Sequence, residues 1–257
     1  MRRVKLACGA ILLLGIPVAV AAAQTPVPTV AVTGAKSSIT LTPSGPIAAG
    51  PTRFTFTGKG EFDLVTLRAG VTVDQFRQTL SSNQEAALAQ IFIEAAAPEP
   101  GRSVTVDLRE NTTYVAVSLV GRASAVTSFT TGARSAAQAP APDARIRMVD
   151  YAFKGPKTLP RNGRIRVENR GSTFHFALAF PLRPGVGTKQ VGRAFRGSSN
   201  KAVGRVVAGP PATVQGLISQ GSTNDNDVQF TRKGRYAMVC FFGEHNRLGM
   251  YRVYKVR

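Results

Sequence analysis

The sequence predicts an all-β protein built from two tandem Greek-key β-sandwich domains, with short helices in the connections. Three observations lead to this prediction. Apolar and polar residues alternate in many short segments, helical periodicity is scarce, and two segments of the first half recur in the same order in the second half. Short strands separated by Gly, Asn and Pro are typical of antiparallel sandwiches. With 257 residues, the chain is long enough for two domains of common size.

Residues 1–23 have the pattern of an export signal. A basic head, "MRRVK", precedes the apolar run "ILLLGIPVAVA" and the small-residue stretch "AVAAAQ". We expect cleavage near Ala23 and an exported protein that is periplasmic, held at the cell envelope or secreted. The alternative is an uncleaved membrane anchor, although Pro17 interrupts the run and the run is short for a bilayer span.

The mature chain divides at a stretch that has little to bury. Residues 24–36 are expected to be a loose lead-in, and residues 37–131 the first domain. Residues 132–144, "GARSAAQAPAPDA", are rich in Ala, Pro and small polar residues, which is typical of a linker. Residues 145–257 are then the second domain.

Alternation identifies the clearest strands, and one long segment has helical character. The strands are expected at residues 52–58, 103–109, 113–119, 164–169 and 235–242. The segment 72–95 is expected to form two short helices, and a weaker helical pattern lies at residues 188–195.

The two halves resemble each other. "RFTFTGKGEFDLVTLRAGVT" and "RIRVENRGSTFHFALAFPLRPGVGT" share a strand, a "KG" or "RG" turn, a Phe-led strand and then "LRAGV" or "LRPGV". Further on, "YVAVSLVGRA" aligns with "YAMVCFFGEH" without a gap. Two matching segments in the same order indicate an internal duplication at domain scale.

The formal net charge of +19 lies mostly in the second half. Residues 24–140 contain nine Lys and Arg against eight acids, whereas residues 141–257 contain 21 against six. Such a surface favours an acidic protein partner or an anionic envelope surface. Nucleic acid is not expected, because the charge comes without interleaved aromatic residues or a known binding module. The oligomeric state is left open.

The candidate site residues are concentrated in the second half. The only histidines of the chain are His175 and His245, and Cys240 is the only cysteine after removal of the signal. In "CFFGEHNRLGM", four residues separate Cys240 from His245 and four separate His245 from Met250. A thiolate, two imidazoles and a weak thioether are the ligands of blue copper, whereas a thioether is a poor zinc ligand. Taken singly, a cysteine, histidine or methionine in such a place is more often an ordinary structural residue than a ligand.

The segment "GRYAMVCFFGEHNRLGMYRVYKV" resembles the copper-binding loop of the cupredoxin family, with spacing similar to that of the rusticyanin-like members. "NRGSTFHFAL" resembles the segment that carries the first histidine of the family, with Phe176 where many members have Asn. The resemblance implies one type 1 copper centre with the ligands His175, Cys240, His245 and Met250. It also implies single-electron transfer rather than enzymatic catalysis, with His245 at the surface as the point of electron exit.

By the same alignment, the first domain has no ligands. Ser118, Ala123 and Ser128 stand in the places of Cys240, His245 and Met250, and Asp63 falls near the place of His175. We therefore expect a cupredoxin-like domain without metal, followed by a copper-binding one. Two alternatives remain open: copper binding for delivery or sequestration without electron transfer, and an interaction module without metal.

Overall fold

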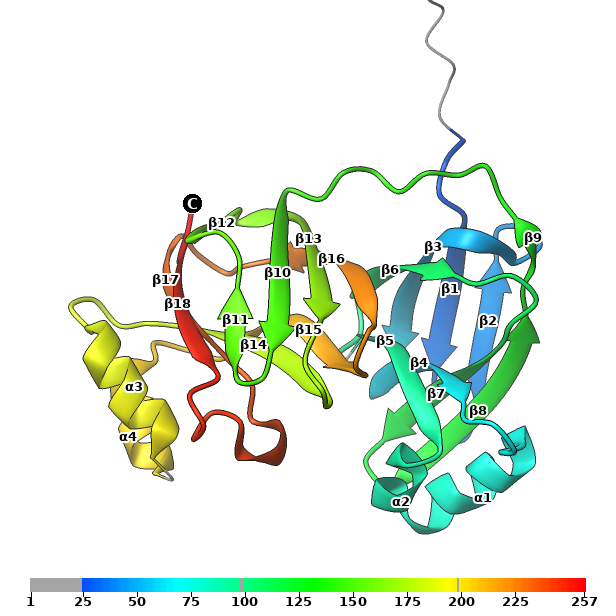
Figure 1. Ribbon diagram of the computed structural model, residues 1–257, viewed down its shortest axis with the longest axis horizontal. Coiled ribbons are helices and arrows are strands. Elements are labelled where there is room, and N and C mark those ends of the chain that lie inside the picture. The colour runs from blue at the N-terminus through cyan, green and yellow to red at the C-terminus, as the bar shows by residue number, and fades with distance from the viewer. Residues whose placement is uncertain (1–24, 98, 198) are drawn as a thin grey trace, which may run out of the picture.

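The computed structural model describes residues 25–97, 99–197 and 199–257, and the predicted signal peptide lies outside them. The described chain forms two β-rich lobes joined side by side (Figure 1). The predicted all-β class, with two sandwiches and short helices in the connections, is confirmed. Within the described part of the chain, no helix has the length and apolar character to cross a bilayer.

The first lobe is a sandwich of two sheets, ordered β6-β3-β1-β2 and β5-β4-β7-β8. Buried aromatic side chains such as Phe54, Phe56 and Phe62 fill the space between them. The elements are β1 (Thr29–Gly34), β2 (Ile39–Pro43), β3 (Ala48–Gly58), β4 (Glu61–Leu67), α1 (Val73–Ser82), α2 (Gln84–Leu88), β5 (Ile91–Ala97), β6 (Ser103–Leu108), β7 (Thr113–Val120), β8 (Ala123–Thr130) and β9 (Gly132–Arg134).

The second lobe repeats this plan, with sheets ordered β11-β10-β13-β16 and β12-β18-β17-β14-β15. Its core contains Met148, Phe230, Tyr236 and Met238. The elements are β10 (Ala144–Val149), β11 (Ala152–Lys154), β12 (Thr158–Leu159), β13 (Asn162–Asn169), β14 (His175–Pro181), α3 (Thr188–Arg196), α4 (Asn200–Val206), β15 (Ala212–Ile218), β16 (Thr223–Gln229), β17 (Gly234–Val239), η1 (Phe242–Glu244) and β18 (Tyr251–Val256).

Four details differ from the sequence prediction. The lead-in is not loose, because β1 lies inside it and pairs with both β2 and β3. The helical segment ends with α2, and residues 91–95 belong to strand β5. The linker segment begins with β9, which pairs with β3, and helix α4 was not predicted at all.

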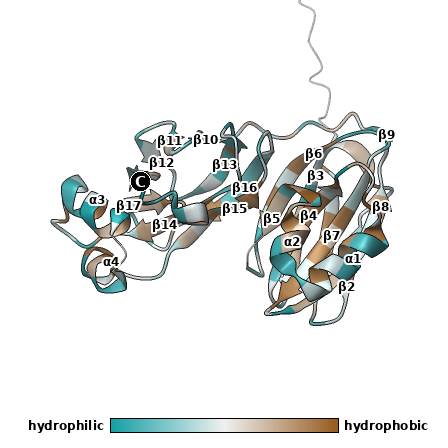
Figure 2. Ribbon diagram, turned by 60° about the horizontal axis from the view of Figure 1, so that its bottom comes forward, coloured by the Kyte–Doolittle hydropathy of each residue, from teal (hydrophilic) through white to brown (hydrophobic). Residues whose placement is uncertain are grey.

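The helices form because local capping agrees with the pattern of apolar residues. Thr72 caps α1 through its side chain, which accepts from the Gln75 backbone N–H, while the Gln75 side chain accepts from the Thr72 N–H. Phe76 and Leu80, four residues apart, then point at the outer face of the sheet. In Figure 2 the polar side of these helices faces away from the strands.

The two lobes are equivalent element by element. The order β5-β4-β7-β8 matches β15-β14-β17-β18, and a helical pair connects β4 to β5 and β14 to β15. Tyr114 and Tyr236, which occupy the same place in the aligned segments, make equivalent hydrogen bonds. The hydroxyl of Tyr114 accepts from the Arg109 N–H at 2.8 Å, and that of Tyr236 accepts from the Arg232 N–H at 3.2 Å. The structure thus shows the duplication that the sequence repeats indicate.

The lobes join through equivalent strands. Strand β16 pairs with β6 antiparallel, with Asp225 opposite Thr105, so that one sheet runs through both domains. On one side of this joint the strands follow in the order β3, β1, β2, and on the other side in the order β13, β10, β11. In both lobes the successive pairings outward from the joint are antiparallel, parallel and antiparallel. The arrangement is that of an approximate two-fold axis at the β6–β16 pair.

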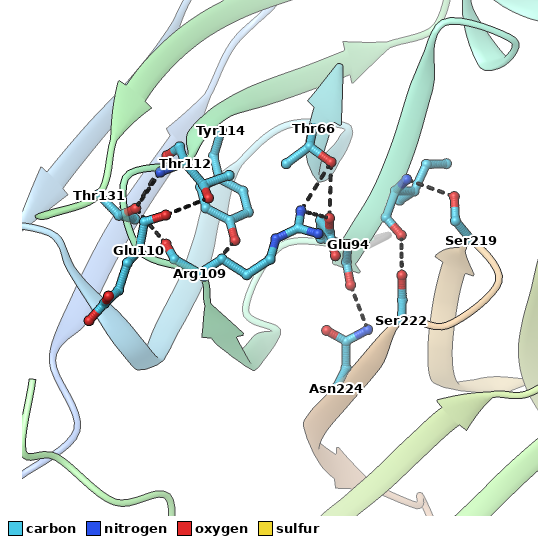
Figure 3. Close-up of polar contacts among 11 residues, drawn as sticks. Thr66, Glu94, Arg109, Glu110, Thr112, Tyr114, Thr131, Ser219, Ser222 and Asn224 are labelled. Carbon is cyan, nitrogen blue, oxygen red and sulfur yellow. Dashed lines mark hydrogen bonds and ion pairs between the residues drawn. The ribbon is translucent and has the colours of Figure 1, made fainter. Parts of the chain in front are cut away.

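Polar contacts reinforce this joint (Figure 3). The Ile93 N–H donates to the Ser219 hydroxyl at 2.8 Å, and the Ser222 hydroxyl donates to the Ile93 carbonyl at 2.9 Å. The side chain of Asn224 donates to the Glu94 carbonyl at 2.9 Å, while Arg109 pairs with the Glu94 carboxylate at 2.6 Å. The hydrogen bonds of Ser219, Ser222 and Asn224 to the backbone of Ile93 and Glu94 cross between the domains and favour one docking geometry.

Candidate metal centre

His175 is the first residue of β14, directly after the turn that follows β13. The buried side chain of Asn169 builds this turn. Its amide donates to the carbonyls of Thr173 at 2.8 Å and Ile218 at 3.0 Å, and its oxygen accepts from the Gly171 N–H at 3.0 Å. With these three bonds the start of β14 is fixed relative to β13 and β15.

The second segment is the loop between β17 and β18. Cys240 follows β17 directly, and Met250 immediately precedes β18. The chain folds back on itself, because the Cys240 N–H donates to the Met250 carbonyl at 3.2 Å and the Met250 N–H to the His245 carbonyl at 2.9 Å. Gly243 and Glu244, with φ of 50° and 63°, make the sharp reversal inside the loop.

Three potential donor atoms from these segments converge. The Nδ1 atoms of His175 and His245 lie 3.1 Å apart, and the Cys240 sulfur lies 3.9 Å from the first and 3.7 Å from the second. Metal bonds of about 2.0 Å to nitrogen and about 2.3 Å to sulfur would separate neighbouring donors by roughly 3 to 4 Å. All three side chains are buried, so the residues fit a single enclosed ion.

Met250 is fully buried in the same core cluster as Cys240. Its two backbone hydrogen bonds reach the two other ligand candidates of the loop, Cys240 and His245. The chemistry of this set is specific. Thiolate and imidazole with a thioether nearby are the donors of a type 1 copper site.

Asp150 fixes the orientation of His175. One oxygen of its carboxylate lies 2.9 Å from His175 Nε2, and the other accepts from the backbone N–H and hydroxyl of Ser172 at 2.8 and 2.6 Å. The hydrogen bonds from Ser172 lower the pKa of Asp150, which therefore stays ionised and can only accept. Nε2 of His175 must then carry the proton, leaving the Nδ1 lone pair aimed at the cluster.

Residue 171 has to be a glycine because of this contact. A Cβ atom there would collide with both Asp150 Oδ1 and His175 Nε2. The Asn-x-Gly turn therefore has a direct role in the site: Asn169 holds the turn, and Gly171 leaves room for the carboxylate–imidazole contact.

Burial sets the protonation of the donors. Desolvation lowers the pKa of His175 and His245 and thus favours the neutral imidazole, the form that binds metals. Burial also raises the pKa of the Cys240 thiol, while the backbone N–H groups of Phe176 and Phe242 act in the opposite direction. A metal that binds here must displace the thiol proton, and these two N–H groups then stabilise the thiolate.

His245 was expected at the surface, but the structure shows it buried. It is 5% exposed, with the ring of Tyr151 at 4.8 Å and that of Phe242 at 5.7 Å between centroids. Tyr151 is itself 40% exposed. An exposed aromatic side chain, directly after Asp150 in the chain, therefore packs on the ring of His245.

The first domain lacks this cluster. Within the described residues, His175, Cys240 and His245 form the one group of this kind. Ser118, in the place of Cys240, is buried at 1% exposure and its hydroxyl has no hydrogen-bond partner. The position assigned to Asp63 needs correction: it faces Val117, as Leu178 faces the aligned Val239. Asp63 thus corresponds to Leu178, three residues beyond His175.

Asp150 was missed by the sequence analysis. A signal for it exists in the strand register, since β10 runs parallel to β13 with Met148 opposite Asn169. Asp150 follows the end of β10 just as the ligand turn follows the end of β13. An acidic residue directly after β10 can reach the turn that follows β13. The sequence alone does not reveal this, because the pairing of β10 with β13 has to be known first.

Comparison with protein-family models and with curated protein sequences finds no match. Solved structures similar to the chain include auracyanin from the photosynthetic bacterium Roseiflexus castenholzii, at 14% identity and a TM-score of 0.29, over 44% of this chain and 94% of that one. Auracyanin B has 18% identity and a TM-score of 0.29, over 47% and 93%. A copper nitrite reductase from Nitrosomonas europaea has 13% identity and a TM-score of 0.28, over 89% and 93%.

The resemblance to cupredoxins drawn from the sequence is confirmed in this chain's own architecture and in its gathered donors. Tandem β-sandwiches with a buried His–Cys–His group at the end of one of them are present. Thiolate and imidazole alone would also suit zinc, so the feature that favours copper is the buried thioether of Met250, because a thioether is a poor zinc ligand.

Proposed function

We propose that this chain is an exported type 1 copper protein that carries single electrons, with His175, Cys240, His245 and Met250 as the ligands. The observation that carries the proposal is the convergence of two Nδ1 atoms and one sulfur, 3.1 to 3.9 Å from one another, in a buried site. Copper held there supplies a one-electron couple between two oxidation states. The signal-like residues 1–23 support export.

The role of the protein's residues is to keep the site rigid and dry. Asp150 holds the tautomer of His175, Asn169 holds the turn before it, and the loop from Cys240 to Met250 is closed by backbone hydrogen bonds. A site that does not rearrange between oxidation states favours fast electron transfer over catalysis. The chain has two histidines, both in this site, so no further histidine-ligated copper centre of an oxidase is available.

The surface around the ligand loop favours an acidic redox partner. Tyr151 and Leu248, at 40% and 58% exposure, are two of the three large hydrophobic residues exposed in the described chain. Beside them, the Asn246 side chain donates to the Phe195 carbonyl, which ties the ligand loop to helix α3. The exposed cations of the α3–α4 hairpin are Lys189, Arg193, Arg196, Lys201 and Arg205. An apolar patch beside a basic one can both contact and steer an acidic protein.

Copper titration tests the proposal. Adding copper(II) to the exported protein should give an intense blue or green colour from the thiolate–copper bond, and Cys240→Ser should remove it. The serine variant is a fair control for folding, because Ser118 already occupies the equivalent buried position of the first domain. A wild-type protein that stays colourless and binds no copper would overturn the assignment.

Voltammetry then separates electron transfer from copper delivery. A carrier should give a reversible one-electron wave and keep its metal in the presence of a moderate chelator. Rapid loss of copper to the chelator without a reversible wave would instead indicate delivery or sequestration. Absence of copper from protein purified from the exported fraction would favour an interaction module.

A further inference from the structure

A second site lies in the first domain, away from the donor cluster. The helices α1 and α2 and the outer face of the sheet β5-β4-β7-β8, together with Leu217 of strand β15 in the second domain, line a cavity of about 260 Å³. Most of its lining is apolar, with Val65, Phe76, Leu80, Ile91, Ile93 and Leu217 among the contributing side chains. A concave, mainly apolar cavity with few polar groups is the common form of a small-molecule site.

All charged groups that line this cavity are acidic. They are Glu61, Asp63 and Glu85, and no lysine or arginine lines the cavity, although the whole chain has a net charge of +19. Glu61 and Glu85 are exposed and Asp63 is half-buried, so negative charge extends from the mouth inward. Other acids of the domain, such as Glu94 and Asp107, have arginine partners. In the described part of the chain the three cavity acids have no ion pair.

The environment of Asp63 is unfavourable for an unpaired carboxylate. Burial, aided by the charge of Glu61, raises the pKa of Asp63 to about 7. A half-buried carboxylate without a cation partner costs stability, because desolvation is not offset by a Coulombic attraction. A strongly perturbed acid in a cavity is a candidate for a functional group.

The second domain, which has the same fold, shows that this fold does not require an acidic residue at the position of Asp63. Leu178 stands where the first domain has Asp63, and Phe180 faces Ala237 just as Val65 faces Val115. In the second domain the layer beneath the helices is filled by aromatic rings. The ring of Phe180 lies 5.4 Å from that of Phe195 and 6.0 Å from that of Phe241. The first domain has smaller side chains and a carboxylate there instead.

We propose that this cavity binds a small amphiphilic organic cation, such as an aryl- or alkylammonium, with its apolar body between Phe76, Leu80 and Ile93 and its ammonium group at Asp63. The inference does not depend on the copper site. An anion would be repelled by the three acids. A neutral apolar molecule would leave Asp63 buried without compensation, and a bare metal ion would leave the apolar volume unused.

The size of the cavity limits the ligand to a compact one. Its volume is slightly below the range usual for drug-sized ligands, about 300 to 1,000 Å³. A fused pair of aromatic rings with a short amine is of suitable size. Such a molecule places a flat apolar body in the cavity and an ammonium group two carbons away, within reach of a carboxylate on the wall.

The test uses 2-(2-naphthyl)ethylammonium as a fluorescent probe, followed by anisotropy with the full-length mature protein at about pH 8, where Asp63 is ionised. The chain has no tryptophan to interfere with the signal. We expect saturable binding of the amine, with binding of the matched alcohol 2-(2-naphthyl)ethanol about tenfold weaker, the ratio that about 1.4 kcal/mol of charge pairing gives. The matched anion 2-naphthylacetate should not bind.

Three variants locate the site. Asp63→Asn should remove the preference for the amine over the alcohol, and Ala87→Phe, which places a ring in the cavity, should remove binding of both probes. Asp74→Asn, on an exposed part of α1, should bind like the wild type. Circular dichroism of each variant establishes that it is folded. Equal binding of amine and alcohol by the wild type, unchanged selectivity in Asp63→Asn, or no saturable binding would overturn the proposal.

Discussion

Nε2 of His175 lies 2.9 Å from a carboxylate oxygen of Asp150, whose other oxygen is held by Ser172. This single contact connects the end of β10 to the beginning of β14 and determines which imidazole nitrogen faces Cys240. It also explains how the site can be ordered although Phe176, rather than an asparagine, follows the first histidine. The bracing comes from a different part of the chain.

Replacing Asp150 should weaken metal binding without removing a ligand. In Asp150→Asn the side chain no longer attracts the Nε2 proton through a negative charge, so the tautomer with a free Nδ1 loses its stabilisation. We expect copper affinity to fall by about 10- to 100-fold, as is common for partners of metal-bound histidines. Competition with a chelator of known affinity measures this, with Asp74→Asn as the exposed control. Equal affinities of both variants and the wild type would contradict the role of Asp150.

Removing the side chain of Asn169 should destabilise the second domain. Its amide and oxygen satisfy three backbone groups in a fully buried position, and Asn169→Ala leaves these groups without partners. We expect the free energy of unfolding to decrease by about 2 to 4 kcal/mol. Denaturant titration followed by circular dichroism gives the value. Asn162→Ala, at the exposed start of β13, is the matched control and should change it by less than about 0.5 kcal/mol.

The contact between the domains should not tolerate a methyl group at residue 216. A Cβ atom there would lie 2.6 Å from the Cβ and 2.9 Å from the carbonyl oxygen of Ala96. Gly216→Ala therefore should cost about 1 to 3 kcal/mol through overpacking. Gly204→Ala meets nothing within 4 Å inside α4 and should stabilise by about 0.5 to 1 kcal/mol. If Gly216→Ala unfolds at the same denaturant concentration as the wild type, the joint is looser than the structure indicates.

Asp63 should make stability fall as the pH rises. The folded protein keeps the Asp63 proton up to about pH 7, whereas the unfolded chain releases it near the ordinary value of 3.8. Between these values the folded state binds more protons, so the free energy of unfolding decreases with increasing pH. Asp63→Asn should remove this decrease.

The experiment compares the two proteins from about pH 5 to about pH 8. His175 and His245 act in the opposite direction, because their lowered pKa makes the unfolded state the one that binds more protons near neutral pH. The informative quantity is therefore the difference in unfolding free energy between Asp63→Asn and the wild type. The unfolding free energy of Asp63→Asn minus that of the wild type should become more positive as the pH rises. A difference that is independent of pH would contradict the burial of Asp63.

The sequence predicts the parts of this molecule that depend on local pattern. Strand alternation and the repeated "LRAGV" and "LRPGV" segments correctly predict two sandwiches, each with a helix after the repeated segment. The spacing of Cys240, His245 and Met250 predicts three ligands on one loop, and in the structure the two ends of this loop are hydrogen-bonded to each other. These features are encoded within a few residues of one another.

The features that escaped prediction depend on long-range pairing. Asp150 reaches His175 only because β10 and β13 are parallel neighbours, and the pairing of β6 with β16 joins residues far apart in the chain. The burial of His245 likewise depends on Tyr151, which is distant in sequence. The local sequence pattern does not indicate these contacts, because each depends on how strands far apart in the chain pair and pack.

The β6–β16 joint has a consequence for how the chain behaves when it is divided. An isologous homodimer brings the same surface of two protomers together about a two-fold axis, and the pairing of the equivalent strands β6 and β16 has this form within a single chain. Each half shields the open β-edge of the other. Either half produced separately would present that edge to solvent and tend to capture a second copy of itself. Because the two halves are covalently connected, they cannot separate, and each molecule contains one half with the His–Cys–His cluster and one half in which the described residues lack it.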